Sequence, residues 1–233
     1  MRALRLLGLA LAGLVGLLVV TFVALQTTPG QAALARVVTR LASGPEGGLQ
    51  VRGLAGFFPT DLQVRDIAYA DRQGAWLIAE DVRLRWSFVA LLAGRLQVEE
   101  LGARRIAVQR APLPSNASTS PSGGGPGLPL GVDVRRLEIV DLHLGRDLVG
   151  TASDWKVTGA ASLPATLRDG TVRLEARRRD GPAGSLAADL RFDLERLWVD
   201  GQATMTEGQG GLVGALLERP DLGAFSLALQ AKG

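Results

Sequence analysis

A single histidine, His143, is the residue best suited to acid–base chemistry near neutral pH. It alternates with Leu142 and Leu144 as in a strand, which places His143 on the polar side. One histidine without any cysteine cannot build an ordinary zinc site. A Ser-His-Asp triad would depend on His143 alone, and no nucleophile-elbow motif is present. We therefore interpret His143 as a surface residue.

Two pairs of adjacent carboxylates are the next candidates for chemistry, Glu80 with Asp81 and Glu99 with Glu100. Adjacent residues of a strand point to opposite faces, so neither pair is expected to share one site. The glycine-rich stretch 208–214 lacks the Lys-Ser/Thr of a phosphate loop and the spacing of a dinucleotide motif. We predict no catalytic residue, no metal site and no cofactor, and we do not expect an enzyme.

Composition favours a folded body with a large apolar surface. Hydrophobic residues make up 47% of the 233 residues and charged residues 21%. The 26 lysines and arginines are interleaved with 23 aspartates and glutamates, and the one marked basic run is 177–179. Binding to nucleic acid is therefore not predicted. The absence of cysteine excludes disulfides and thiolate chemistry.

The N-terminal stretch has the pattern of a membrane anchor, predicted at 1–28 with a short cytoplasmic N-terminus. Arg2 and Arg5 precede a charge-free run at 6–25, and a helix of that length spans roughly 30 Å, the thickness of a bilayer core. The apolar side chains expected in the membrane are Leu6, Leu9, Leu14, Leu17, Val20, Phe22 and Leu25. The flanking charges favour a body on the outer side. The alternative is a signal peptide cleaved near Ala32, but the run exceeds the roughly 7–15 residues of a signal core.

A short amphipathic helix is expected next, at 29–44. Thr28 and Pro29 are residues typical of an N-cap and a first helical turn. An apolar stripe and a basic face recur at helical spacing in Leu34, Val37, Val38 and Leu41, and in Arg36 and Arg40. This helix would lie at the membrane surface or cap the start of the body.

From Leu49 onward the dominant period is two, which indicates strands with one apolar and one polar face. The alternating apolar sets are Val82, Leu84 and Trp86; Val172, Leu174 and Ala176; Leu186, Ala188, Leu190, Phe192 and Leu194; and Phe225, Leu227 and Leu229. A motif of apolar-x-apolar-x-x-apolar recurs at 62–67, 96–101 and 132–137. Its last residue changes parity, so each copy requires a bulge or bend. Such repetition indicates stacked units rather than a compact globule.

Two interruptions divide the body. Residues 111–130 are rich in proline, glycine and serine, and predict a flexible loop between a first β segment at 45–110 and a second at 131–233. Residues 208–222 predict one or two helical turns that end near Pro220. The expected fold is mainly β: an elongated, twisted, one-sided, antiparallel-rich sheet that forms an open groove behind the two N-terminal helices.

Three motifs carry a resemblance to a known family. They read GFFPTDLQVRDI at 56–67, IAEDVRLRWS at 78–87 and ALLAGRLQVEEL at 90–101. In order and spacing they resemble the N-terminal region of the TamB family, the AsmA-like subunits of the translocation and assembly module. The tail from 194 to 229 is similar to a repeat found later in that family. Members are several times longer, so we expect a fragment or a truncated gene product.

The resemblance implies a long β-taco-like groove that is anchored in the inner membrane of a diderm bacterium and faces the periplasm. It implies a partner, an outer-membrane Omp85-type barrel (TamA-like), and a role in outer-membrane biogenesis. That role would be phospholipid transport between membranes, assistance to outer-membrane protein assembly and secretion, or both.

The groove hypothesis predicts an apolar lining that contacts membrane lipids. The expected lining residues are Val82, Leu84, Trp86, Leu96, Val98, Leu186, Leu190 and Phe192. From the residues alone, an ordinary closed hydrophobic core is the alternative for this set. The alternative function is a membrane-tethered adaptor that binds protein strands by edge addition, without lipid transport.

Overall fold

The computed structural model describes residues 26–41, 43–44, 47–113, 130–216 and 223–232. Eleven strands form one sheet, in which each strand lies beside its neighbours in the sequence. The strands are β1 (Ser43–Gly44), β2 (Gly47–Phe57), β3 (Asp61–Asp71), β4 (Gly74–Ser87), β5 (Arg95–Val108), β6 (Gly131–Leu144), β7 (Ser153–Leu163), β8 (Gly170–Arg178), β9 (Gly184–Asp193), β10 (Trp198–Glu207) and β11 (Phe225–Lys232). The helices are α2 (Thr28–Leu41), α3 (Phe88–Leu92), α4 (Arg146–Val149) and α5 (Leu212–Leu216).

The sheet is open and mixed. All neighbouring strands pair antiparallel except β5 and β6, which pair parallel. In the described part of the chain β1 and β11 form the two edges and do not pair with each other. The prediction of a mainly β, unclosed sheet is therefore confirmed. Because β5 ends the first strand-rich segment and β6 begins the second, their parallel pairing joins both segments into one sheet.

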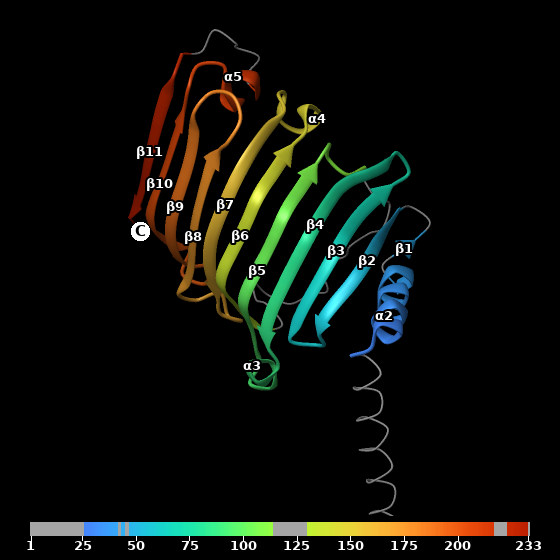
Figure 1. Ribbon diagram of the computed structural model, residues 1–233. Helices are drawn as coiled ribbons and strands as arrows, with labels where there is room; N and C mark the ends of the chain where they lie inside the picture. The colour runs from blue at the N-terminus through green and yellow to red at the C-terminus, as the bar shows by residue number, and fades with distance from the viewer. Residues whose placement is uncertain (1–25, 42, 45–46, 114–129, 217–222, 233) are drawn as a thin grey trace, which may run out of the picture.

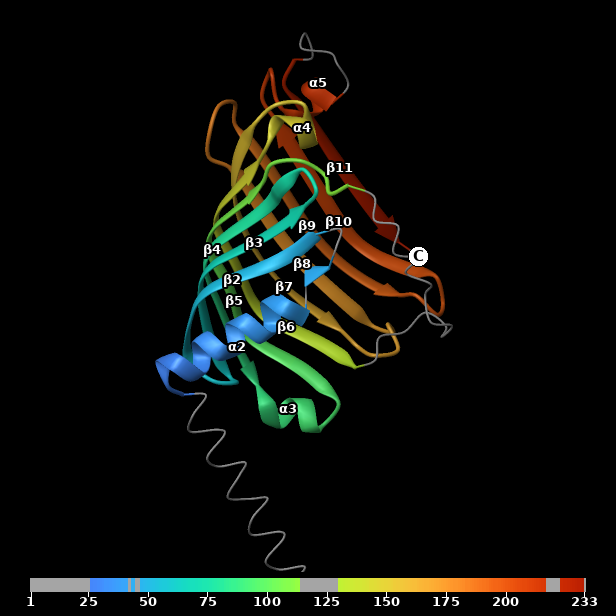
Figure 2. The same ribbon diagram turned by 90° about the vertical axis from the view of Figure 1, so that its right-hand side faces the viewer.

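The sheet is strongly curved, with one concave and one convex face (Figures 1 and 2). Helices α4 and α5 lie at one end of the strands, and α3 lies at the other end between β4 and β5 (Figure 1). Helix α2 packs along β2 near the N-terminal edge (Figure 2). The two faces of the sheet therefore differ in curvature, and the side chains on each face determine which ligands it can bind.

Cross-strand register separates apolar from polar side chains. One row of successive partners runs through ten strands from Gly56 on β2, and its further members are Leu62, Leu84, Leu101, Leu137, Gly159, Leu174, Ala188, Ala203 and Leu229. The row one residue away faces the opposite side and contains Gln63, Arg83, Gly102, Glu138, Thr158, Glu175, Ala187, Thr204 and Ala228. Adjacent residues of a strand alternate between faces, so the first row gives the sheet an apolar face.

Bulges keep the apolar residues on one face where the sequence motif changes parity. In β6 the register against β7 shifts between Val134 and Leu137, and it shifts again between Ile139 and Leu142. In β5 the register against β4 shifts opposite Trp86. Each shift gives one strand an extra residue, so the next apolar side chain returns to the same face. The bulges predicted for the copies at 96–101 and 132–137 are confirmed.

The buried core lies at the α4–α5 end of the concave face. Trp155, Val157, Ala176 and Leu212 form a cluster, against which Leu142, Leu144, Val149 and Leu186 pack, among others. Leu212 belongs to α5 and Val149 to α4, so both helices cover the strands here. Glu207 holds α5 in place, because its carboxylate accepts hydrogen bonds from the backbone N–H groups of Leu212 and Val213. The helical turn predicted within 208–222 is thus present at 212–216.

Helix α2 lies where the amphipathic helix is predicted, and Leu34 of the predicted apolar stripe is half-buried, while the side chains of Val38 and Leu41 lie outside what the structure describes. Its N-cap is Thr27, whose Oγ1 accepts from the N–H of Gly30 at 3.3 Å, and Val37 is 52% exposed. Ala35 is buried, and Thr39 Oγ1 accepts from Val51 N at 3.2 Å. This bond forms because α2 lies against the edge of a sheet, where unpaired backbone groups require polar partners.

The predicted anchor at 1–28 falls almost entirely outside the described residues. Among the helices that the structure does describe, none combines the length and hydropathy of a membrane span.

Candidate functional site: the concave apolar face

Cross-strand register places the eight predicted lining residues on the apolar side of the sheet, and their contact with lipid stays a prediction. Val82, Leu84 and Trp86 alternate along β4, Leu96 and Val98 along β5, and Leu186, Leu190 and Phe192 along β9. They form two groups, because β6, β7 and β8 separate β5 from β9.

One continuous row connects the two groups. Trp86 pairs with Val98 and Val98 with Val134. The row then continues through Ala161 and Val172 to Leu190. The three intervening residues were not among the predicted lining, although Val134 belongs to the repeated motif and Val172 to an alternating set. The sequence therefore contained the pattern for the whole row, but not the strand order that connects it.

Self-packing covers this face unevenly. Val98 is 5% exposed, and Leu186 packs against the buried cluster beneath α5. Leu84, Leu101 and Leu137 are half-buried. No second sheet lies over the concave face in the part of the chain that the structure describes. The end near α4 and α5 is thus closed by the chain's own side chains, whereas the β4–β6 part keeps apolar surface exposed to solvent.

The convex face is charged and paired across strands. Arg173 Nη2 lies 2.8 Å from Asp189 Oδ2, and Lys156 Nζ lies 3.2 Å from Glu138 Oε1. These side chains are well exposed, so each pair adds little to stability. Arg173 and Asp189 are direct cross-strand partners, so their opposite charges still favour the observed register over a one-residue slip, which would bring the charges to the apolar face.

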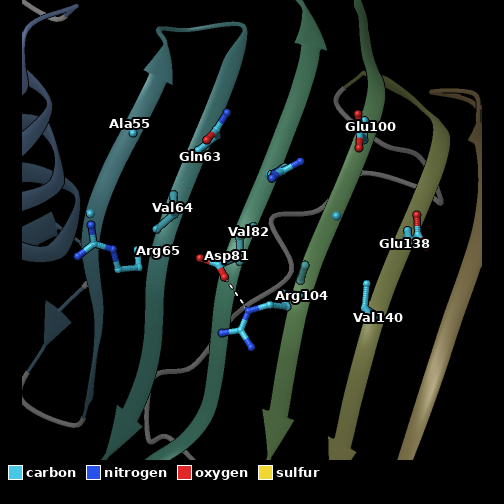
Figure 3. A pocket seen from close by; sticks show the side chains of 14 residues that line it. Ala55, Gln63, Val64, Arg65, Asp81, Val82, Glu100, Arg104, Glu138 and Val140 are labelled. Carbon is cyan, nitrogen blue, oxygen red and sulfur yellow. Dashed lines mark hydrogen bonds and ion pairs between the residues drawn. The ribbon is translucent and has the colours of Figure 1, made fainter. Parts of the chain in front are cut away.

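A hollow of about 490 Å³ opens on this convex face, over β2 to β6 (Figure 3). Its lining mixes charges: Arg65, Arg83 and Arg104 with Asp81, Glu100 and Glu138. Arg104 Nε donates to Asp81 Oδ2 at 2.6 Å, and its Nη2 donates to Glu80 Oε2 at 2.5 Å. These carboxylates raise the pKa of Arg104, with Asp81 contributing most.

The pairing of Arg104 corrects one prediction. Glu80 and Asp81 were expected to point to opposite faces, yet both bind the same guanidinium. The cause is the left-handed backbone of Asp81, with φ of 49°, which breaks the alternation of β4. On β2, which is separated from β4 by β3, Gly53 has φ of 66°, and a Cβ there would lie 2.7 Å from Cβ of Arg65.

His143 belongs neither to the apolar rows of the concave face nor to the lining of the convex hollow. Its Nδ1 is 2.7 Å from Asp154 Oδ1, on the strands β6 and β7. Within the described ranges no group of three or more histidine, aspartate or glutamate side chains is arranged to hold a metal ion. The His143–Asp154 pair is a cross-strand contact on the polar side, since these two residues are partners in the β6–β7 register.

The comparison with protein-family models decides the family. Residues 17–192 match the TamB N-terminal domain, which is more than half of the 233-residue chain. The chain belongs to the TamB N-terminal domain family. The family match therefore confirms the resemblance that the three sequence motifs carried. None of the curated proteins and none of the solved structures that were compared matches the chain.

Membership in the TamB N-terminal domain family draws attention to the concave face rather than to the convex hollow. The matched range covers β1 to β8 and all of β9 except its last residue, and it includes all eight predicted lining residues. The convex hollow is small, open and electrically mixed, so it offers no surface for a long apolar ligand. The concave face offers the continuous apolar rows described above.

Proposed function

We propose that this TamB-family chain is an inner-membrane-anchored, periplasmic component of outer-membrane biogenesis, and that its concave face carries acyl chains of phospholipids. The single observation that supports this proposal best is the apolar row that runs without a charged residue from Leu62 on β3 to Leu229 on β11. The anchor, the periplasmic location and an Omp85-type barrel as partner are part of the proposal. It contains no catalytic step.

The energetic argument concerns the cost of moving an acyl chain through water. Each buried CH₂ contributes about 0.8 kcal/mol, so a 16-carbon tail in water costs roughly 12 kcal/mol relative to an apolar surrounding. An apolar row such as Leu84, Leu101 and Leu137 lowers that cost at every strand. Half-burial of these side chains leaves area for contact with a ligand.

The size of the sheet limits what this chain does alone. Eleven strands spaced by about 4.8 Å extend roughly 50 Å. We propose that this part loads lipid near the inner membrane, and that further strands or a partner continue the path. Because the cluster under α5 is closed, we propose that the loading surface lies on β4, β5 and β6.

Photocrosslinking tests the proposal with matched pairs of neighbouring residues. A benzophenone amino acid is placed at Leu84 or Leu137 on the concave face, and at Arg83 or Glu138 on the convex face of the same strands. After irradiation in cells, mass spectrometry is expected to find phospholipid adducts at the two leucine positions and a several-fold lower yield at the two convex positions. Equal yields at both faces, or no adduct at either leucine, would contradict a lipid-carrying face.

The alternative is an adaptor that captures protein strands at β11. Leu227 and Leu229 are 44% and 58% exposed, and β11 has one strand neighbour in the described part of the chain. A strand edge with free backbone groups can pair with an extended peptide. The same crosslinker at Ser226 or Gln230 distinguishes the two functions: peptide adducts there, with none of lipid at Leu84 and Leu137, would favour the adaptor.

A further inference from the structure

The five-residue helix α3 exposes most of its apolar side chains to solvent. Val89 and Leu92 are each 76% exposed, and Phe88 is 46% exposed. Ser87 caps the helix by accepting from Ala90 N at 3.3 Å, so the turn is well formed and not a frayed loop. An ordered turn that presents adjacent apolar side chains to water indicates a surface that is covered in the working protein.

Trp86 joins α3 to the β2–β3 turn. Its indole Nε1 donates to Pro59 O at 2.5 Å, and its backbone N–H donates to Thr60 O at 2.9 Å. Its ring meets Phe88 edge to face, with 6.1 Å between the ring centroids. The adjacent Phe57 is 56% exposed. We call α3 together with residues 57–60 the aromatic tip.

Gln26 joins the aromatic tip to the start of the described chain. Its side-chain amide donates to Phe58 O at 2.6 Å and accepts from Phe58 N at 3.1 Å. Figures 1 and 2 show α3 and the start of α2 at the same end of the sheet. In the sequence, Gln26 directly follows the charge-free run at 6–25, so no spacer separates that run from the tip.

We propose that the aromatic tip inserts into the interfacial layer of the bilayer that holds residues 6–25. The inference rests on the anchor in the proposed function, but not on lipid transport. If the apolar run spans a membrane, its last residue lies at the membrane surface, and the two hydrogen bonds of Gln26 hold Phe58 beside it. Trp86 then places α3 at the same level.

The chemistry of the tip fits a lipid surface. Aromatic side chains favour the headgroup region, where Trp86 and Phe88 would lie, while Val89 and Leu92 reach the acyl boundary. Arg95, at the start of β5, is exposed and can extend its charge toward lipid phosphates. Such a contact would fix the orientation of the sheet relative to the membrane, because the tip and the anchor attach at separate points.

Fluorescence quenching in vesicles tests this contact with the full chain. Because the protein has no cysteine, single variants Val89→Cys, Leu92→Cys and Gln73→Cys each take one environment-sensitive label. Gln73 is the control, since it is exposed in the β3–β4 turn at the opposite end of the strands. In phosphatidylethanolamine–phosphatidylglycerol vesicles with brominated acyl chains, labels at 89 and 92 are expected to be quenched several-fold more than the label at 73.

Three outcomes separate the inference from the proposed function. Quenching at 89 and 92 no greater than at 73, in protein that floats with the vesicles, overturns the tip contact while the anchor stands; a protein partner on α3 would give that result. A chain that does not float with vesicles overturns the anchor and the inference together. Strong quenching with no lipid adduct at Leu84 or Leu137 supports the tip and contradicts lipid transport.

A double variant tests whether apolar contact, rather than proximity to the anchor alone, holds the aromatic tip in the membrane. Val89→Asp combined with Leu92→Asp is expected to fold, because both side chains are largely exposed. A label at Phe57→Cys should then lose most of its quenching by brominated lipid. Unchanged quenching at 57 would show that the anchor alone holds the tip near the membrane and would overturn insertion.

Discussion

Arg110 and Asp71 hold the segment that follows β5 against the β3–β4 turn. The guanidinium of Arg110 donates to both carboxylate oxygens of Asp71, at 2.6 and 2.7 Å, and both side chains are largely buried. Leu113 N also donates to Asp71 Oδ2 at 3.0 Å. These bonds pin the chain leaving β5 to the β3–β4 turn. Asp71 therefore links the β3–β4 hairpin to the start of the segment that leads from β5 to β6.

Acid is expected to weaken this link. The hydrogen-bonded guanidinium of Arg110 holds the pKa of Asp71 well below its ordinary value of 3.8. A carboxyl with a lowered folded-state pKa stabilises the fold fully above that ordinary value, and the contribution is lost as pH falls below it. We predict that Asp71→Asn lowers the urea midpoint at pH 7, and that this effect declines progressively as pH falls below 3.8, until the folded-state carboxyl is itself protonated.

The matched control for Asp71 is Glu175→Gln on the convex face, where the side chain is exposed. It is expected to change the urea midpoint little across this pH range. If Asp71→Asn and Glu175→Gln respond alike across the pH range, the Arg110 link contributes nothing specific to acid stability.

Residue-scale features were the hardest to predict from the sequence. The alternation of Val82, Leu84 and Trp86 predicts one shared face for them, and the register of β4 agrees, because burial on one side of a sheet determines a period of two. The shared binding of Arg104 by Glu80 and Asp81 was missed, since it follows from one left-handed residue. Whether a residue adopts positive φ depends on the neighbouring strands, and a period-two pattern in the sequence carries no information about them.

At the scale of elements, α5 depends on the end of β10. Glu207 is 4% exposed and accepts from the first N–H groups of the helix, including Val213 N at 2.8 Å. Without this acceptor those groups would be buried and unsatisfied, and Leu212 would lose its position over Trp155. The cap therefore decides whether the α5 end of the concave face stays closed.

Removing the cap is expected to open that end. Glu207→Ala should lower the free energy of unfolding by about 1–2 kcal/mol, the usual cost of a lost helix cap. Hydrogen exchange should accelerate at the amides of Leu212 and Val213. Gln209→Ala, an exposed change in the same turn, is the control. Equal exchange in both variants would mean that packing of Leu212, and not the Glu207 carboxylate, holds α5.

Helix α2 illustrates what a helical pattern predicts and what it omits. The position of the helix was predicted within one residue of its start, from Thr28 and Pro29. Its polar contacts with the sheet were not predicted, because a hydrophobic stripe says nothing about polar contacts. Gln31 Nε2 donates to Gly56 O at 3.0 Å along the sheet edge. The partner of an element decides which of its faces is buried, and the sequence of the element alone does not name that partner.

At the scale of the whole molecule, the sheet is a stack in which strands contact their nearest neighbours. The strand order follows the sequence from β1 to β11. The repeated motif predicted such stacking, but not the parallel pairing of β5 with β6, because the long connecting sequence at 111–130 permits either direction. In a stack of this kind, stability is close to a sum of local terms. A destabilising substitution in one strand is therefore expected to weaken mainly that strand and its neighbours.

A glycine in β10 tests that locality. Gly201 has φ of 146°, and a Cβ there would lie 2.2 Å from the carbonyl oxygen of Asp189 on β9. We predict that Gly201→Ala forces β10 away from β9, so amide protection in β9, β10 and β11 falls strongly in hydrogen exchange. Protection in β3, β4 and β5 should stay near its original level, and Gln202→Ala, an exposed neighbour, should change neither region. Uniform loss across all strands would instead require one cooperative unit, in which strands β4 to β6 and the closed α5 end could not open independently.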